Sequence, residues 1–168
     1  MVTGFFCIGY NEFMDMQVRK IIKGEEQELW NLFYNTVNHI NSQDYNQSQI
    51  ASWAPVDYPR EQVIKKFREL DPFVVIKNEQ IIAYADIQED GYIDHFYCHH
   101  QFQRQGVGSL LFARLEQQAI ENGIKKMYSN VSITAKPFFE AKGFDVEKEQ
   151  RLEMGNEQVK NYRMVRIL

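Results

Sequence analysis

Residues 103–109 read Gln-Arg-Gln-Gly-Val-Gly-Ser, and this stretch decides the fold. It follows a strand-like run and opens an apolar-periodic segment over 107–121. Gly106 and Gly108 let the backbone approach a ligand closely, and the amides at a helix start favour an anion. Arg104 adds a cation. The stretch predicts a pyrophosphate site, although two glycines also suit a plain strand-to-helix turn. It is neither a Walker loop nor a dinucleotide fingerprint, because the Lys-Ser/Thr pair and the third glycine are missing.

The same stretch, preceded by Phe96-Tyr97-Cys98-His99-His100, resembles the acetyl-CoA loop of the GNAT superfamily of N-acetyltransferases, which reads Gln-x-x-Gly-x-Gly. Residues 132–144 read Ser-Ile-Thr-Ala-Lys-Pro-Phe-Phe-Glu-Ala-Lys-Gly-Phe and resemble the later family segment of Asn-x-x-Ala, an aromatic residue and Gly-Phe. Two motifs in this order are far more specific than either alone. The run 137–139 together with Asn-Tyr-Arg-Met at 161–164 resembles the bacterial YafP-like branch.

Hydrophobic periodicity predicts a mixed α/β chain. Strands are expected at 17–22, 73–76, 81–87, 92–98, 126–131, 144–152 and 161–167, and helices at 25–40, from Pro59 on, at 107–121 and at 135–142. Tight turns join the strands at 73–98 into an antiparallel meander. The resemblance implies an α/β (α+β) GNAT fold with a mixed, strongly twisted sheet, a V-shaped opening and helices on both faces. We expect one domain over 16–168 after an N-terminal arm, 1–15, that is dispensable or an over-called start.

Composition narrows the class of protein. Apolar residues make up 44% of the 168 residues and aromatic residues 14%, which excludes a disordered chain. A net charge of −4 disfavours nucleic acid as a partner, and no apolar run is long enough to span a membrane. Cys7 and Cys98 are too few for a disulfide framework and predict reduced thiols in the cytoplasm. The start lacks the basic segment of a secretory signal.

The resemblance implies that acetyl-CoA lies in the split of the sheet. Residues expected to contact it are Phe96, Tyr97, Cys98, Gln103, Arg104, Gln105, Gly106, Val107, Gly108, Ser109, Ser132, Phe138 and Phe139. The backbone of Tyr97 and Cys98 would pair with the pantetheine arm, and the amides of 103–109 would hold the pyrophosphate. A backbone amide near Tyr97 or Cys98 would polarise the thioester carbonyl.

Two positions depart from the family pattern. Ser132 stands where many members have Asn, and Phe139 stands where many have a Tyr that protonates the departing thiolate. A phenylalanine cannot donate a proton. Tyr162 is the leading replacement, because the last strand borders the same cavity in the family. The alternative for Tyr162 is a half-buried tyrosine that packs on the sheet.

A base is needed as well, because an amine is mostly protonated at neutral pH. Alternation along the strand at 92–98 puts Asp94 on the same face as Tyr92, Phe96 and Cys98. Several family members use a carboxylate on the cofactor-facing side of this strand, so the resemblance makes Asp94 the matching candidate, although it stands two residues nearer the loop than in those members. The alternative is a solvated or turn-bonding aspartate, and Asp86, Glu89 and His95 are weaker candidates.

We expect Trp53 and Tyr92 to contact the acceptor, with hydrophobic packing as the alternative for Trp53. The predicted function is acetyl-CoA-dependent transfer to a primary amine, of a small molecule, by direct attack in a ternary complex. A protein N-terminus or lysine as acceptor and a non-catalytic acyl-CoA-binding module remain alternatives. No metal is expected, because the adjacent His99 and His100 would point apart on an extended chain. A homodimer, common in the superfamily, is left open.

Overall fold

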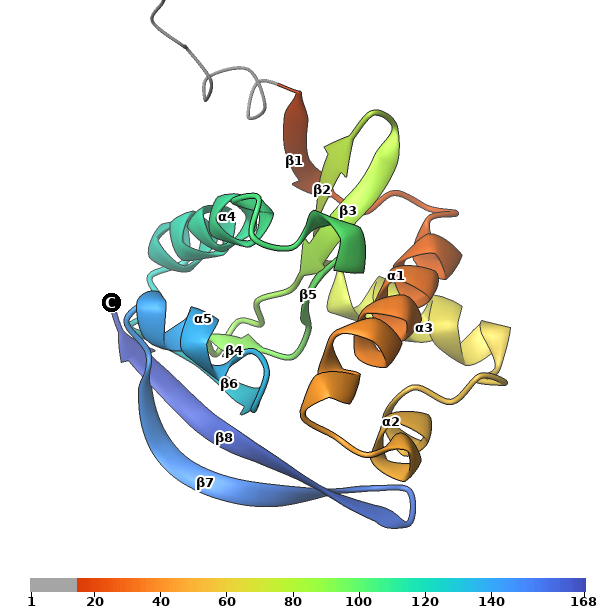
Figure 1. The fold of residues 1–168 in the computed structure, drawn as a ribbon. Coiled ribbons are helices and arrows are strands. Elements are labelled where there is room, and N and C mark those ends of the chain that lie inside the picture. Colours follow the sequence, from red (N-terminus) through yellow and green to blue (C-terminus); the bar gives the residue numbers. More distant parts are fainter. Residues whose placement is uncertain (1–14) are drawn as a thin grey trace, which may run out of the picture.

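The computed structural model describes residues 15–168 (Figure 1). Its strands are β1 (Met16–Lys20), β2 (Phe73–Lys77), β3 (Gln80–Ala85), β4 (Tyr92–Ile93), β5 (Phe96–Cys98), β6 (Lys126–Ser132), β7 (Asp145–Met154) and β8 (Glu157–Ile167). Its helices are α1 (Glu26–His39), α2 (Gln47–Trp53), α3 (Arg60–Leu70), α4 (Val107–Glu121) and α5 (Lys136–Ala141), with short 3-10 turns η1 (Asn41–Gln43) and η2 (His100–Phe102). The mixed α/β fold is confirmed. The predicted arm at 1–15, with Cys7, lies outside the described residues apart from Asp15.

The strands form two four-stranded sheets, in the orders β1-β2-β3-β5 and β4-β6-β8-β7. The predicted antiparallel meander is confirmed for β2, β3 and β5. The predicted continuous strand at 92–98 is wrong, because β4 pairs in parallel with β6 while β5 pairs with β3. The chain therefore changes sheets at Asp94 and His95, where the buried Asp86 carboxylate accepts their backbone N–H groups.

The first sheet is covered on both faces (Figure 1). Val75 and Ile82 belong to the core beneath α4, whereas Val74 and Tyr84 belong to the core beneath α1 and α3. Neighbouring residues of a strand point to opposite faces, so a strand with helices on both sides is apolar throughout. Such a rigid, doubly covered sheet is a firm support for a site at its edge.

The polar stretch between α1 and α3, for which the sequence pattern predicts no helix or strand, folds into η1 and α2. Asn46 caps α2, because its side chain accepts the N–H of Gln49, whose own side chain accepts the N–H of Asn46. This reciprocal pair is a capping box. Hydrogen bonds from Ser48 to the Glu157 carboxylate (2.6 Å) and from Gln49 to the Gln158 carbonyl (2.7 Å) then tie α2 to β8.

Within residues 15–168, no helix has both the length and the apolar character needed to cross a membrane.

Candidate functional site

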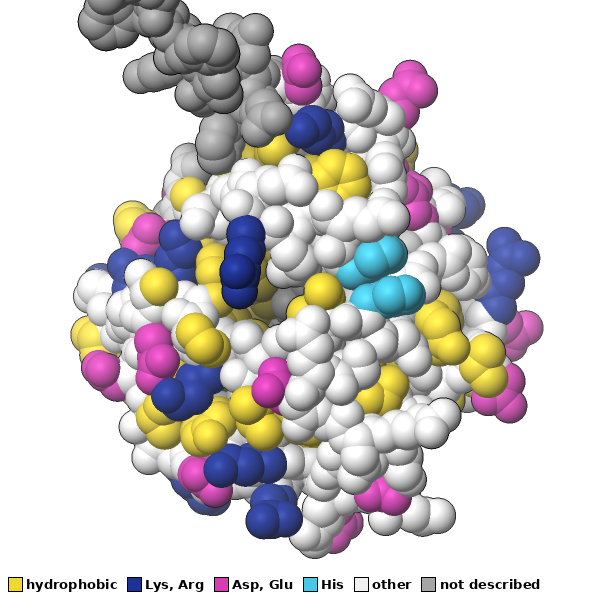
Figure 2. Space-filling view, viewed as in Figure 1, with side chains coloured by type: hydrophobic (Ala, Val, Ile, Leu, Met, Phe, Trp, Pro, Cys, Tyr) yellow, Lys and Arg dark blue, Asp and Glu magenta, His cyan; other side chains and the backbone are white. Residues whose placement is uncertain are grey.

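A cavity of about 810 Å³ lies where the two sheets part, between β5 and β6. Its walls come from the end of α1, η1, Trp53, β5, the segment 102–109, β6 and the start of α5. The face viewed in Figure 2 is hollowed, and histidine side chains gather beside the hollow. The residues of both family-like motifs, far apart in the sequence, therefore meet at one opening.

The helix α4 presents its uncapped N-terminus to this cavity. Gly106 is the N-cap residue, with a left-handed φ of 79°, and within residues 15–168 no side chain caps this end of the helix. The first N–H groups of a helix have no partner within the helix, and the helix dipole attracts negative charge to them. Gly106 and Gly108 both line the cavity, as does Arg104. This end of the cavity is suited to a phosphate.

Gly108 lies so close to its neighbours that a side chain would not fit freely. A Cβ atom there would lie 3.2 Å from Cε2 of Phe138 and 3.5 Å from Sγ of Cys98. The first contact is tighter than side chains normally make. A side chain here would therefore require the Phe138 ring to shift by a few tenths of an ångström, and it would also reduce access to the amides.

Not every predicted residue of the loop faces the cavity. Gln103, Arg104, Gly106, Gly108 and Ser109 line it. Val107 is buried in the core, and Nε2 of Gln105 donates to the Gln101 carbonyl at 3.1 Å, so neither is part of the lining. Nε2 of Gln103 donates to the Cys98 carbonyl at 2.7 Å, which fastens the loop to the end of β5.

The free edge of β5 runs along the cavity. The bonds from Asp86 N to His95 O and from His99 N to Ile82 O show that odd-numbered residues of this segment pair with β3. The N–H groups of the even-numbered residues, Phe96 and Cys98, therefore face away from β3 and toward the split. The expectation that the Tyr97 backbone faces the split is wrong, because Tyr97 pairs with Tyr84.

Aromatic rings form an apolar part of the lining. The ring of Phe96 lies 5.1 Å from that of Phe138 and 5.7 Å from that of Phe139. Beside them, burial raises the pKa of the Cys98 thiol to about 12. The thiol is therefore protonated at neutral pH and is a poor nucleophile.

The hydroxyl group of Ser132 lines the cavity but already has protein partners. It accepts the N–H of Ala135 at 3.0 Å, at the turn that leads into α5. It also lies 3.5 Å from Nδ2 of Asn41, which reaches the Thr134 hydroxyl at 3.4 Å. Asn41 thus joins η1 to the end of β6.

The predicted base and acid lie in different places. Asp94 lines the cavity, with 40% of its side chain exposed. Tyr162 is not among the lining residues. The Nζ atoms of Lys136 and Lys160 each lie 5.4 Å from the centroid of its ring. The structure brings Asp94, but not Tyr162, to the cavity that holds the predicted cofactor loop.

The acceptor side of the cavity includes residues that the sequence analysis missed. Trp53 lines the cavity. Tyr92 is not among the lining residues, but its hydroxyl donates to Oδ1 of Asp94 at 3.3 Å. Further lining residues come from the end of α1, from the polar stretch that follows it and from β6: Thr36, Ile40, Asn41, Gln43, Asp44, Ser129 and Asn130. The Asn-x-x-Gln capping signal at 46–49 was the available hint that this region is folded.

The histidines next to the cavity are stacked rather than splayed. The rings of His99 and His100 lie 4.4 Å apart, and His39 stacks on His100 at 4.3 Å. The expectation that the neighbouring pair points apart is wrong, because the chain turns into η2 there. Across the part of the chain that the structure describes, no group of three or more acidic, His or Cys side chains could hold a metal ion.

The buried Asp86 carboxyl group predicts a pH dependence of stability. Burial raises its pKa to about 6, above the ordinary 3.8, against opposing hydrogen bonds from Gln88 and the His95 backbone. Between these values the native chain holds a proton that the unfolded chain has lost. The contribution of Asp86 to the free energy of unfolding therefore falls as the pH rises from 4 to 6.

The variant Asp86→Asn removes this titration. We expect its stability relative to the wild type to rise as the pH increases from 4 to 6, by up to about 3 kcal/mol, and then to level off. Urea unfolding of both proteins across this range measures the difference. A difference that does not change with pH would contradict the buried titration. The Gln88 amide can rotate to face the new NH₂ group, so the variant is expected to fold.

Comparisons with known proteins agree with this arrangement. A family model described as an acetyltransferase (GNAT) domain matches residues 41–165. The uncharacterized N-acetyltransferase YafP from Escherichia coli strain K12 is 34% identical over 139 residues, which cover 83% of this chain and 87% of that protein.

Solved structures share the fold at low sequence identity. A GCN5-related N-acetyltransferase from Rhodopseudomonas palustris aligns with a TM-score of 0.86 and 18% identity, over 90% of this chain and 95% of that one. The PaiA N-acetyltransferase from Thermoplasma acidophilum, crystallised in complex with coenzyme A, aligns with a TM-score of 0.75 and 15% identity, over 91% and 99%.

Proposed function

The chain belongs to the GNAT family of acetyltransferases and is an N-acetyltransferase, and on this basis we propose that it transfers the acetyl group of acetyl-CoA directly to the primary amine of a small molecule. The observation that carries the proposal is the meeting of an uncapped helix N-terminus and a cavity-facing carboxylate, Asp94, in one cavity. The first suits a pyrophosphate and the second suits a cationic amine. The coenzyme A bound to the similar PaiA enzyme supports the same donor here.

In the proposed mechanism, some residues bind the donor, acetyl-CoA, and others act on the acceptor amine. The amides at the start of α4, with Arg104, hold the pyrophosphate, and the N–H groups of Phe96 and Cys98 face the acyl arm. Asp94 takes the proton from the ammonium group. The amine nitrogen then forms a bond to the thioester carbonyl carbon. As this intermediate collapses, the carbon–sulfur bond breaks, CoA leaves with its electron pair, and the nitrogen gives its second proton to water.

The carbonyl oxygen becomes negative during this step. The N–H of Cys98 donates to it from the free edge of β5, a form of stabilisation that such sites commonly use. No acyl-enzyme is required, which agrees with the protonated state of the Cys98 thiol. Phe139 cannot protonate the leaving thiolate, so we assign that proton to water.

The closed acceptor wall favours a small molecule over an extended peptide. The Tyr45 hydroxyl donates to the Lys160 carbonyl at 2.7 Å and accepts the N–H of Ile133 at 2.8 Å. With the contacts of Ser48, Gln49 and Asn41, these bonds fasten the segment after α1 to β6 and β8. A peptide would have to displace this segment, whereas a small amine beside Trp53 would not. A cytoplasmic location is part of the proposal and rests on the cysteine content alone.

A screen for thiol release from acetyl-CoA tests the proposal. One arm of the screen contains small primary amines and the other contains peptides with a free N-terminus or a lysine. We expect saturable thiol release with a small amine, an N-acetylated product by mass spectrometry and intersecting initial-rate patterns. Release only with peptides would overturn the acceptor class, parallel patterns would overturn the ternary complex, and binding without any turnover would overturn direct transfer.

A further inference from the structure

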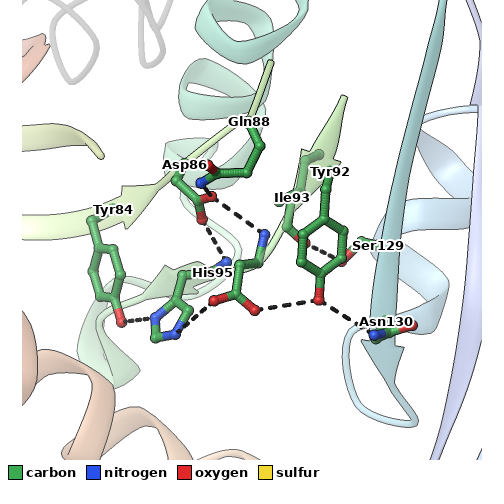
Figure 3. A network of polar contacts seen from close by, with 9 residues as sticks. Tyr84, Asp86, Gln88, Tyr92, Ile93, His95, Ser129 and Asn130 are labelled. Carbon is green, nitrogen blue, oxygen red and sulfur yellow. Dashed lines mark hydrogen bonds and ion pairs between the residues drawn. The ribbon is translucent and has the colours of Figure 1, made fainter. Parts of the chain in front are cut away.

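A buried histidine, His95, lies beside the Asp94 carboxylate, and its ring points toward Tyr84 (Figure 3). His95 is 6% exposed, is not part of the cavity lining, and lies among the rings of Phe33, Tyr84 and Tyr97. Burial lowers its pKa well below 6.5, with a smaller contribution from the positive charge of Lys66. The imidazole is therefore neutral at neutral pH and carries a single N–H.

Tyr84 decides which ring nitrogen carries that proton. Its hydroxyl lies 2.8 Å from Nδ1 of His95, and within residues 15–168 it has no other hydrogen-bond partner. Tyr84 is fully buried, and burial raises its pKa well above 10, so the hydroxyl keeps its proton. A buried hydroxyl that keeps its proton must donate it. Nδ1 is then the acceptor, and the imidazole proton lies on Nε2.

The protonated nitrogen faces the carboxylate. Nε2 of His95 lies 3.8 Å from Oδ2 of Asp94, while Oδ1 accepts the Tyr92 hydroxyl, which in turn accepts from Nδ2 of Asn130 at 3.3 Å. If the distance between these two atoms shortened by about 1 Å, the N–H of His95 would come within hydrogen-bond range of the carboxylate. Each oxygen of Asp94 thus faces a different donor, which favours one orientation of the carboxylate.

The backbone beneath this pair is fastened as well. The Asp86 carboxylate accepts the N–H of His95 at 2.6 Å and faces the N–H of Asp94 at 3.5 Å. Nε2 of Gln88 donates to the same carboxylate at 2.6 Å (Figure 3). The chain is held at the point where it passes from β4 to β5, so the side chains of Asp94 and His95 are anchored together.

We propose that His95, held in its Nε2–H form by Tyr84, is a positioning residue that orients the Asp94 carboxylate toward the amine in the cavity. This role rests on the proposed function, in which Asp94 accepts the amine proton. His95 does not touch the substrate. It acts through Asp94, so the effect of removing it depends on whether the carboxylate is present.

Nitrogen NMR of the imidazole tests the tautomer without any need for activity. In the wild type we expect two-bond ¹H–¹⁵N spectra to show the Nε2–H form of His95, unchanged between pH 7 and 5.5. In Tyr84→Phe, which lacks the hydroxyl, we expect a mixture of both tautomers. An Nδ1–H form, or protonation of His95 within this range in the wild type, would overturn the proposal.

A pair of substitutions at His95 tests the positioning role. Glutamine places an amide nitrogen near the position of Nε2, whereas asparagine places one near Nδ1. We expect His95→Asn to lower kcat about tenfold and to leave the KM for acetyl-CoA little changed. A tenfold loss is a part of the ~10²–10⁴-fold rate increase that general acid–base catalysis contributes. His95→Gln should recover most of the loss. Equal losses in both variants would overturn the proposal.

The same substitution in the Asp94→Asn background separates positioning from a structural defect. We expect His95→Asn to cause no further loss of kcat there, because the group on which it acts is gone. An equal loss in both backgrounds would overturn the proposal. Melting temperatures check that each variant is folded, and Tyr84→Phe replaces His95→Asn in the cycle if that variant does not fold. Absence of turnover by the wild type would count against the proposed function alone, because the NMR result still decides the tautomer.

Discussion

Replacing Gly108 with aspartate is expected to weaken acetyl-CoA binding on the order of 100-fold, the size of a repulsion between two charges a few ångströms apart near a protein surface. Gly108 lies in the first turn of α4, where the free amides face the cavity. An aspartate there would bring a negative charge to the expected pyrophosphate site and would itself bond to the amides. A carboxylate in the first turn of a helix is favourable for folding. We therefore expect the loss of affinity to exceed by far any loss of stability caused by the close contact with Phe138, measured by calorimetric titration and thermal melting.

Two matched variants separate charge from size. Gly108→Asn has nearly the same volume without the charge, and Gly108→Ala adds only the Cβ atom that would lie 3.2 Å from Phe138. We expect the losses to increase from alanine to asparagine to aspartate, and the difference between the last two to shrink in high salt. If Gly108→Asp is folded and titrates acetyl-CoA like the wild type, the pyrophosphate does not lie at this helix.

Local signals explain why this end of the site could be predicted from sequence. The observed α4, Val107–Glu121, coincides with the predicted segment 107–121, because its apolar spacing and the glycine at its start act within one helix. The same holds for α5, which lies within the predicted 135–142 and ends two residues before Gly143. Two such segments, together with the strand before the first, were enough to identify the fold.

The other end of the site depends on contacts that local patterns do not encode. The chain leaves β4 and enters β5 because Asp86, eight and nine residues upstream, accepts the N–H groups of Asp94 and His95. Alternation alone predicted an unbroken strand. The wall around Asn41 was missed because its stability comes from long-range bonds, such as that from Tyr45 to Lys160, and the stretch is polar.

The second large effect is expected from Asp94→Asn, which should lower kcat/KM for the amine by about 100-fold or more near pH 7. The amide keeps the shape of the side chain and can still accept from the Tyr92 hydroxyl, but it cannot take a proton from the ammonium group. As the pH approaches the pKa of the acceptor, more of the amine is already deprotonated in solution. The difference in kcat/KM between the variant and the wild type should therefore shrink as the pH rises, and pH–rate profiles of the two proteins measure this difference.

Two further variants show whether the effect is specific to this carboxylate. Glu89→Gln removes a nearby negative charge from an exposed turn outside the cavity lining, and we expect it to leave the pH profile unchanged. Tyr162→Phe tests the acid. If Tyr162 protonates the thiolate, the loss should be the same at every pH, because leaving-group stabilisation does not depend on amine ionisation. Since Lys136 and Lys160 lie against its ring and it is absent from the lining, we expect a smaller loss than at Asp94. If Asp94→Asn keeps the wild-type rate and profile, Asp94 handles no proton, and water at the edge of β5 must do so.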